Sequence, residues 1–133
     1  MNTYKCPFQV PQIKRDFACT LGVEMTRRDG VAVACRSSSS SYRCCELYEQ
    51  LKQVALDAFD MNDDLLQVPQ SLYIKVQYGG LLGLQRLLGD VRQDVLDISS
   101  LVAQLYERYG TIENVPCSQV KTDIQSCRLR RKR

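Results

Sequence analysis

The chain has 133 residues, of which 44% are apolar and 25% charged, a length and composition that describe one globular domain and exclude a disordered protein. It contains seven cysteines and no histidine, which excludes zinc sites that mix Cys with His and removes the commonest general base of enzymes. The net charge of +3 comes from the C-terminus, because subtracting the five basic side chains of residues 128–133 leaves −2 for residues 1–127.

The start of the chain and its hydropathy bear on where the protein resides. Residues 1–7 lack the apolar core of a secretory signal peptide, and the apolar runs are far shorter than the roughly 20 residues that span a bilayer. We therefore expect a cytoplasmic protein without membrane contact. In a reducing compartment the cysteines are expected to be thiols or thiolate ligands, because disulfides rarely persist there.

The first 35 residues predict a small β-hairpin module. Two prolines near the start favour a loop followed by a short helical turn. Apolar residues then alternate with polar or small ones along 21–26 and again along 31–35, and Asp29-Gly30 between the two runs is typical of a tight hairpin turn. The second predicted strand ends at Cys35.

A run of five serines, residues 37–41, follows the hairpin and precedes a predicted helix. Apolar residues at spacings of three and four predict this helix from about residue 41 to Phe59. We interpret the serines as a loop or helix start that folds over a site, because serine hydroxyls favour helix caps over helix interiors. The first turn of the helix is then expected to carry Cys44 and Cys45.

The second half of the chain predicts further helices. Residues 72–78 alternate as a strand does, but Pro69 just before them is typical of a helix start, and we favour the helix. From Leu81 to Tyr109 the apolar residues are spaced three and four apart over four heptads, which predicts one long helix that ends at Gly110. Its apolar surface is wider than a two-stranded coiled coil needs, so we expect it to form the centre of a bundle.

Several features of this region have two interpretations. The apolar seam is interpreted as core packing, with a self-associating face as the alternative. Gly83 and Gly89 each cost about 1 kcal/mol of helix propensity relative to alanine, so we expect them to mark close contact with another helix.

A short helix is expected after Pro116. The chain closes on basic residues that are interpreted as a solvated end or as a contact for nucleic acid: Arg128, Arg130, Arg131, Lys132 and Arg133.

Together these elements predict a mainly α (α+β) fold, a helical bundle around a long central helix with a small N-terminal Cys-bearing β-hairpin module. We expect a single domain over residues 1–127. Within it the hairpin module occupies residues 1–45, the helical core 46–110 and a C-terminal segment 111–127. Residues 128–133 form a basic tail.

Five of the seven cysteines lie within the first 45 residues, a concentration that core filling does not explain. No Cys-x-x-Cys pair is present, which weakens the case for a zinc ribbon or a thioredoxin-type redox site. Iron–sulfur ligands need no single spacing, because separate loops can supply them. The predicted helix start favours thiolates through its dipole and free N–H groups, with Arg36 and Arg43 adding positive charge. The candidate ligands are Cys6, Cys19, Cys35 and Cys44, with Cys45 competing with Cys44 for one position.

The sequence thus predicts a small cytoplasmic cysteine-ligated metalloprotein that binds an iron–sulfur cluster in electron transfer or redox sensing, with zinc as the alternative occupant. Two other interpretations of the cysteines stay open, namely thiols that fill the core and a redox switch at Cys44-Cys45. The alternative function is a non-enzymatic helical adaptor or interaction protein with structural cysteines. Its basic tail is then expected to contact nucleic acid or an acidic partner, and its helical face a protein or a second copy. An enzyme is disfavoured, because no nucleophile with an adjacent base can be identified.

Overall fold

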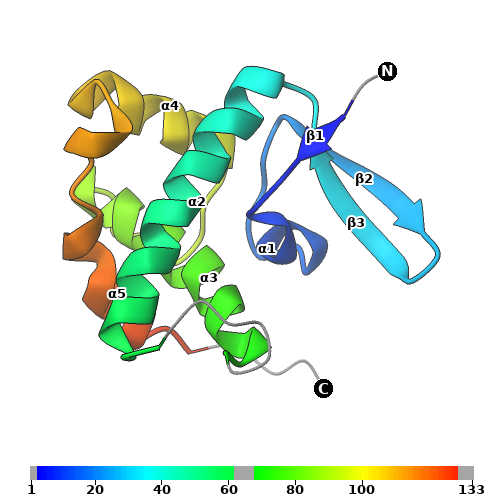
Figure 1. Ribbon diagram of the computed structural model, residues 1–133. Coiled ribbons are helices and arrows are strands. Elements are labelled where there is room, and N and C mark those ends of the chain that lie inside the picture. The colour runs from blue at the N-terminus through cyan, green and yellow to red at the C-terminus, as the bar shows by residue number, and fades with distance from the viewer. Residues whose placement is uncertain (1–2, 62–67, 129–133) are drawn as a thin grey trace.

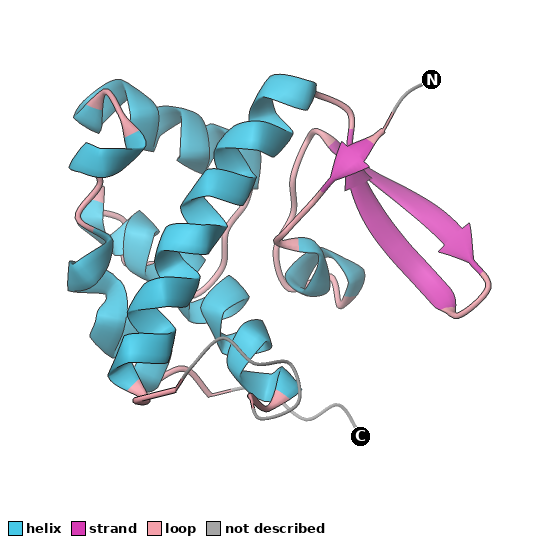
Figure 2. Cartoon of the chain, in the orientation of Figure 1, coloured by secondary structure: helices cyan, strands magenta, loops and turns pink. Residues whose placement is uncertain are grey.

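In the computed structural model, which describes residues 3–61 and 68–128, a body of helices carries a small sheet at one side (Figures 1 and 2). The strands are β1 (Tyr4–Lys5), β2 (Gly22–Arg27) and β3 (Gly30–Cys35). The helices are α1 (Gln9–Ile13), α2 (Ser38–Ala58), α3 (Gln70–Leu87), α4 (Ile98–Tyr109) and α5 (Lys121–Gln125), with 3₁₀ turns at Ile112–Asn114 and Cys117–Val120. The predicted mainly α (α+β) class with an N-terminal β-hairpin module is confirmed.

The sheet is antiparallel, with the strand order β1-β3-β2. The predicted hairpin is confirmed, and Gly30 adopts a φ of 128° after the turn, a conformation that favours glycine. The hairpin projects away from the helices (Figure 1), so Val31 near its tip is 51% exposed whereas Cys35 at its base is 8% exposed. Only the base of the hairpin therefore contributes to the interior.

Helix α2 begins at Ser38, about three residues earlier than the sequence predicts. The side chain of Ser37 accepts a hydrogen bond from the Ser40 backbone N–H at 3.2 Å and so caps the helix. The serine run is therefore the helix start, and the prediction that Cys44 and Cys45 occupy the first turn is wrong. Both lie beyond it, where the backbone N–H groups are already used within the helix.

Two helices, α3 and α4, occupy the region predicted to form one long helix from Leu81 to Tyr109, so the predicted length of that helix is wrong. Helix α3 starts after Pro69, as favoured, and ends at Leu87. Gly89 follows with a φ of 93°, which turns the chain out of the helix. In the connecting segment the seam residue Val95 reaches the core, where it is 2% exposed, but the seam residue Val91 is 76% exposed, so the regular spacing does not reflect a continuous buried face.

Polar side chains fix the segment between the two helices. The Gln85 amide donates hydrogen bonds to the backbone carbonyl oxygens of Arg92, at 3.3 Å, and Asp94, at 2.9 Å. Asp97 then caps α4 by accepting a hydrogen bond from the Ser99 N–H, at 3.2 Å. Gly110 ends α4, as predicted, with a φ of 83°.

Glycines let α3 and α5 approach closely. A Cβ at Gly79 would lie 2.6 Å from the Asp123 carbonyl oxygen, and one at Gly83 would collide with the Val120 side chain. The expected close contact at Gly83 is therefore found, and the adjacent 3₁₀ turn and α5 supply the partner. The same expectation for Gly89 is wrong, since its surroundings are open and its role is to end α3.

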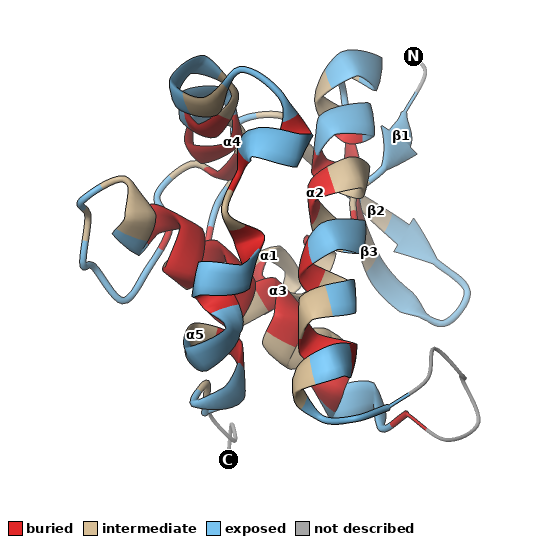
Figure 3. Ribbon diagram, turned by 60° about the vertical axis from the view of Figure 1, so that its left-hand side comes forward, coloured by how far each residue is buried: buried red, intermediate tan, exposed pale blue. Residues whose placement is uncertain are grey.

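The interior lies where the inner faces of α2, α3 and α4 meet, as the buried surfaces in Figure 3 indicate. Most seam residues point into it, which supports core packing over a self-associating face: Leu81, Leu84, Val95, Ile98, Val102 and Leu105. Among residues 3–61 and 68–128, no helix has the length and apolar character needed to cross a bilayer. Arg128 is exposed, and it is the one basic residue of the predicted tail that lies within the described residues. The later basic residues lie outside them.

Candidate functional site

Four cysteines from separate parts of the chain line one small cavity at the base of the hairpin. Cys6 follows β1, Cys19 lies in the loop before β2, Cys35 ends β3, and Cys44 comes from α2. The cavity has a volume of about 20 Å³. Apolar groups form almost all of its remaining wall, among them Leu21, Ala34 and Ile98. Four cysteines, of which Cys35 and Cys44 are buried and Cys6 and Cys19 are half-buried, therefore line a small and mostly apolar space.

Strand pairing explains how the first three cysteines meet. In the sheet Cys35 stands opposite Gly22 of β2 and Tyr4 of β1. Cys6 lies two residues after Tyr4, and the Cys19 carbonyl oxygen accepts a hydrogen bond from the Gly22 N–H at 3.0 Å. The hairpin thus gathers residues that are up to 29 positions apart in the sequence.

Helix α2 brings the fourth cysteine. The Ser41 hydroxyl donates a 2.6 Å hydrogen bond to the Lys5 carbonyl oxygen, which joins the start of α2 to β1. Cys44 lies three residues further along the same helix face, so this bond turns it toward the cavity. The serine run therefore contributes a wall of the site, through Ser40 and Ser41, instead of a covering loop.

The loop that carries Cys19 is fastened to the start of α4. The Ala18 N–H donates to the Val95 carbonyl oxygen at 3.0 Å, and the Ile98 N–H donates to the Ala18 carbonyl oxygen at 2.8 Å. Asp97, which caps α4, also accepts a hydrogen bond from the Thr20 N–H at 3.0 Å. Burial alone would raise the pKa of Asp97, but the hydrogen bonds from Thr20 and Ser99 outweigh it and lower that pKa.

Burial controls the protonation of the thiols. It raises the pKa of Cys6 to about 11, although hydrogen bonds from the Phe8 N–H and the Gln12 amide act in the opposite direction. Burial also raises the pKa of Cys44 far above its ordinary range, and the neighbouring thiols add to the effect by charge repulsion. At neutral pH Cys6 and Cys44 are protonated, because burial disfavours the charged thiolate.

Two hydrogen bonds are directed at sulfur atoms of the site. The Gln12 side-chain amide donates to the Cys6 sulfur at 3.2 Å, and the Ser37 N–H donates to the Cys35 sulfur at 3.5 Å. The Cys35 thiol itself donates to the Ser37 carbonyl oxygen at 3.3 Å. Donors of this kind also stabilise a thiolate when the proton leaves, as they do around metal centres.

The structure separates Cys44 from Cys45. Cys44 is 9% exposed and lines the cavity, whereas Cys45 is half-buried and is not among the described residues that line it. Adjacent residues on a helix point about 100° apart, so only one of the two can face the site. Arg43, expected beside the thiols, lies over the Tyr106 ring, 5.0 Å from its centroid. The helix-start argument for thiolates therefore does not hold for these cysteines.

The two C-terminal cysteines take no part in this arrangement. Cys117 is buried in the core at the start of a 3₁₀ turn, and Cys127 follows α5. Across the described ranges 3–61 and 68–128, no group of three or more His, Cys, Asp or Glu side chains could hold a metal ion in its present arrangement. Metal binding at the four-cysteine cavity thus requires the thiols to turn inward.

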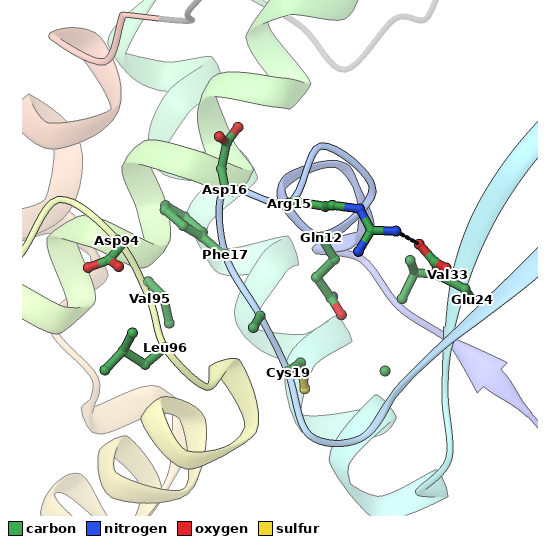
Figure 4. A pocket seen from close by; sticks show the side chains of 12 residues that line it. Gln12, Arg15, Asp16, Phe17, Cys19, Glu24, Val33, Asp94, Val95 and Leu96 are labelled. Atoms are coloured by element: carbon green, nitrogen blue, oxygen red, sulfur yellow. Dashed lines mark ion pairs between the residues drawn. The ribbon is translucent and has the colours of Figure 1, made fainter.

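A larger, open pocket of about 350 Å³ adjoins the cysteine cavity (Figure 4). Cys19 and Gly22 line both spaces. In Figure 4 the side chain of Gln12 extends from α1 toward the loop that carries Cys19, and Arg15 forms a 3.5 Å ion pair with Glu24 at the rim.

Sequence reasoning missed three residues that shape the site. Asp97 could have been found, because an aspartate just before an apolar helical pattern is a typical helix cap. Gln12 and Gly22 carry no comparable signal, since their importance arises only from tertiary contact. Comparison of the chain with protein-family models, with curated proteins and with solved structures finds no match.

Proposed function

We propose that the protein is a small cysteine-ligated metalloprotein in which Cys6, Cys19, Cys35 and Cys44 bind an iron–sulfur cluster. The observation that carries the proposal is the convergence of four cysteines, from three loops or strand ends and one helix, on a single apolar cavity. Buried thiols that only fill space have no need to meet. Four thiolates match the ligand number of the common iron–sulfur clusters.

A metal centre in this cavity has to displace protons from thiols. Burial, with a smaller contribution from repulsion by the neighbouring cysteines, raises the pKa of Cys6 and of Cys44 and keeps these two thiols protonated. A metal centre replaces these protons and compensates the thiolate charges. The donors from Gln12 and Ser37 then act on ligand sulfurs, and such hydrogen bonds raise the reduction potential of a cluster.

A single zinc ion is the second candidate, and the size of the cavity favours it. A volume of about 20 Å³ accommodates roughly one water-sized guest. A cluster of several iron and sulfur atoms requires the walls to move apart. Against zinc stands the spacing of the ligands, because structural zinc sites usually take theirs from close pairs. We favour the cluster, and with it a role in electron transfer or redox sensing in the cytoplasm.

The basic C-terminus is proposed as a contact for an acidic partner or nucleic acid. Arg128 is exposed, and the sequence continues with four more basic residues after it. Such contacts weaken steeply as salt concentration rises. A chain that ends at Cys127 is expected to lose this salt-dependent binding, and unchanged binding contradicts the proposal.

Anaerobic purification followed by analysis of iron, zinc and acid-labile sulfide per chain tests the main proposal. Iron and sulfide in similar amounts, with a brown colour, are the expected result. Zinc in place of iron supports the second candidate. A colourless chain that contains neither metal, and that takes up neither iron with sulfide nor zinc when these are added, contradicts both.

A further inference from the structure

The edge of β3 that faces away from β2 is only partly covered by β1. Strand β1 pairs with two residues of β3, Ala34 and Cys35, and the chain then turns into α1, since Pro7 has no N–H with which to continue a strand. In Figure 2 the hairpin extends well beyond β1. Within the part of the chain that the structure describes, this edge of β3 therefore has no neighbouring strand from Gly30 to Val33.

Val31, which is 51% exposed, presents its backbone groups on this edge. Peptide groups of a strand point alternately to its two sides. The Arg36 N–H donates to the Leu21 carbonyl oxygen on the β2 side, at 2.9 Å. The Val33 N–H donates to the Gln9 side chain on the opposite side, at 3.2 Å. Val31 lies two residues before Val33, so its N–H and C=O also point away from β2.

A groove of about 620 Å³ runs along the same edge. Residues 31–34 of β3 all line it. Because consecutive side chains of a strand point to opposite faces, a space lined by four consecutive residues lies along the edge of the strand. Val10 and Ile13 of α1, both half-buried, form an apolar wall, and β1 lies at one end. An extended peptide is the partner that pairs with an open strand edge of this kind.

Basic side chains make this groove suited to an acidic guest. Lys5 stands beside Ala34 at the base of the hairpin and Arg27 beside Gly30 at its tip, and both line the groove. Both are exposed, and neither forms an ion pair with another described residue. Asp29 is the one carboxylate among the described lining residues. A second copy of the chain would bring the same basic side chains to the groove, so the charges favour a different, acidic partner.

We propose that an acidic, extended segment of a partner protein binds in this groove as a further strand beside β3. Its backbone continues the line of β1 and exchanges hydrogen bonds with the N–H and C=O of Val31, while alternate side chains contact Val10 and Ile13. Its carboxylates lie near Lys5 and Arg27. The inference does not depend on what the cysteine cavity binds, so the two proposals can fail separately.

The test measures, by fluorescence anisotropy, the binding of a fluorescein-labelled pentapeptide of alternating valine and glutamate to the full chain. Val31→Pro removes the N–H on the open edge, keeps the hydrogen bonds to β2, and is expected to weaken binding about tenfold. Thr26→Pro is the matched control. Thr26 stands opposite Val31 in the hairpin, and its N–H points to the other edge of the sheet, so binding should be unchanged.

Two further comparisons do not depend on how a proline is tolerated. A glutamate probe with N-methylated amides cannot donate hydrogen bonds to β3, and should bind the unaltered chain about tenfold more weakly. Arg27→Ala should weaken binding about two- to threefold, as expected for an exposed charge. Arg28→Ala changes the adjacent basic residue, which is not among the described lining, and should leave binding unchanged.

Each contrary result overturns a stated part of the proposal. Unchanged affinity in Val31→Pro, or equal affinity for the two glutamate probes, overturns the added strand. A probe of alternating valine and lysine that binds as tightly overturns the acidic partner. No binding of the glutamate probe at millimolar concentration overturns peptide docking altogether. If the chain alone sediments as a dimer that Val31→Pro abolishes, a second copy occupies the edge and the proposal is wrong.

Discussion

Cysteines that are partly or fully buried occur in two regions of this molecule, and in only one of the regions do they converge. Cys6 at the hairpin base and Cys117 beside α5 both have a pKa raised to about 11, chiefly by burial. Cys6 shares its cavity with three other thiols, whereas Cys117 is surrounded by the apolar core. The comparison teaches that burial makes a thiol inert, and that convergence makes a group of thiols a candidate for binding a cation.

The largest expected effect comes from removing one of the four converging thiols. Cys44→Ser is expected to reduce the metal content per chain to about a tenth of that of the unaltered protein, because a four-ligand site loses a ligand. Cys117→Ser changes an equally buried thiol and is expected to leave the metal content unchanged. Elemental analysis of the purified variants measures both.

The metal content of Cys45→Ser, compared with that of Cys44→Ser, tests two adjacent cysteines of α2 against each other. Because Cys45 is absent from the described lining of the cavity, this variant is expected to retain its metal. A loss of metal in Cys45→Ser equal to that in Cys44→Ser contradicts the assignment of Cys44 as the ligand.

The next effect concerns stability and should be confined to the region around α5, where Cys117 lies. Gly79→Ala places a methyl group 2.6 Å from the Asp123 carbonyl oxygen, and backbone there cannot yield easily. We expect a loss of about 2–3 kcal/mol in the free energy of unfolding, measured by urea titration. Gly80→Ala is the control, since its methyl group meets the Leu51 side chain, at 2.8 Å, instead of backbone, and the substitution gains about 1 kcal/mol of helix propensity that offsets this contact.

A smaller loss of stability is expected when the contact that holds the Cys19 loop is removed. Asp97→Ala removes the cap of α4 and the acceptor for the Thr20 N–H, and is expected to cost about 1–2 kcal/mol of stability. Since the folded state lowers the pKa of Asp97, its contribution is present above about pH 4 and is lost as the pH falls further. The stability difference between Asp97→Ala and the unaltered protein should therefore shrink in acid. A constant difference at all pH values contradicts this account.

A further expected effect is a loss of stability at alkaline pH. The folded, metal-free chain keeps the protons of Cys6 and Cys117 up to a pKa of about 11, against an ordinary value of 9.0. Their contribution to stability is thus complete below about pH 9 and is lost as the pH rises through 11. Urea titrations of the metal-free chain between about pH 9 and 11 should show that the free energy of unfolding falls less steeply with pH in Cys6→Ser and in Cys117→Ser than in the unaltered protein.

Metal should remove this likeness between the two cysteines. Cys6→Ser lacks a ligand and is expected to lose the metal, so adding metal should leave its alkaline stability curve nearly unchanged, whereas the curves of Cys117→Ser and of the unaltered protein should both change. If metal changes the curve of Cys6→Ser as much as that of Cys117→Ser, then Cys6 is not a ligand.

Much of the fold could be predicted from local signals. Asp29-Gly30 identified the hairpin, Pro69 the start of α3 and Gly110 the end of α4, because each acts through its own backbone conformation or its immediate neighbours. The break after Leu87 could not be predicted from spacing. Val95 keeps the heptad pattern while lying outside any helix, since a connecting segment can also bury an apolar side chain.

The candidate site was accessible to sequence reasoning only in part. The concentration of cysteines before residue 45 identified which residues to consider, and the hairpin explains why Cys6, Cys19 and Cys35 meet. The choice of Cys44 over Cys45 depends on the rotation of α2, which the Ser41 hydrogen bond to the Lys5 carbonyl oxygen sets. A tertiary contact of this kind leaves no local pattern in the sequence.

The most direct test of the central claim is to count the sulfur neighbours of the bound metal by X-ray absorption at its edge. The account predicts a shell made of sulfur alone, at about 2.3 Å if the metal is zinc. Cys44→Ser should lose this signal and Cys117→Ser should keep it. A shell that contains nitrogen or oxygen, or an all-sulfur shell that persists in Cys44→Ser, would contradict the four-cysteine site.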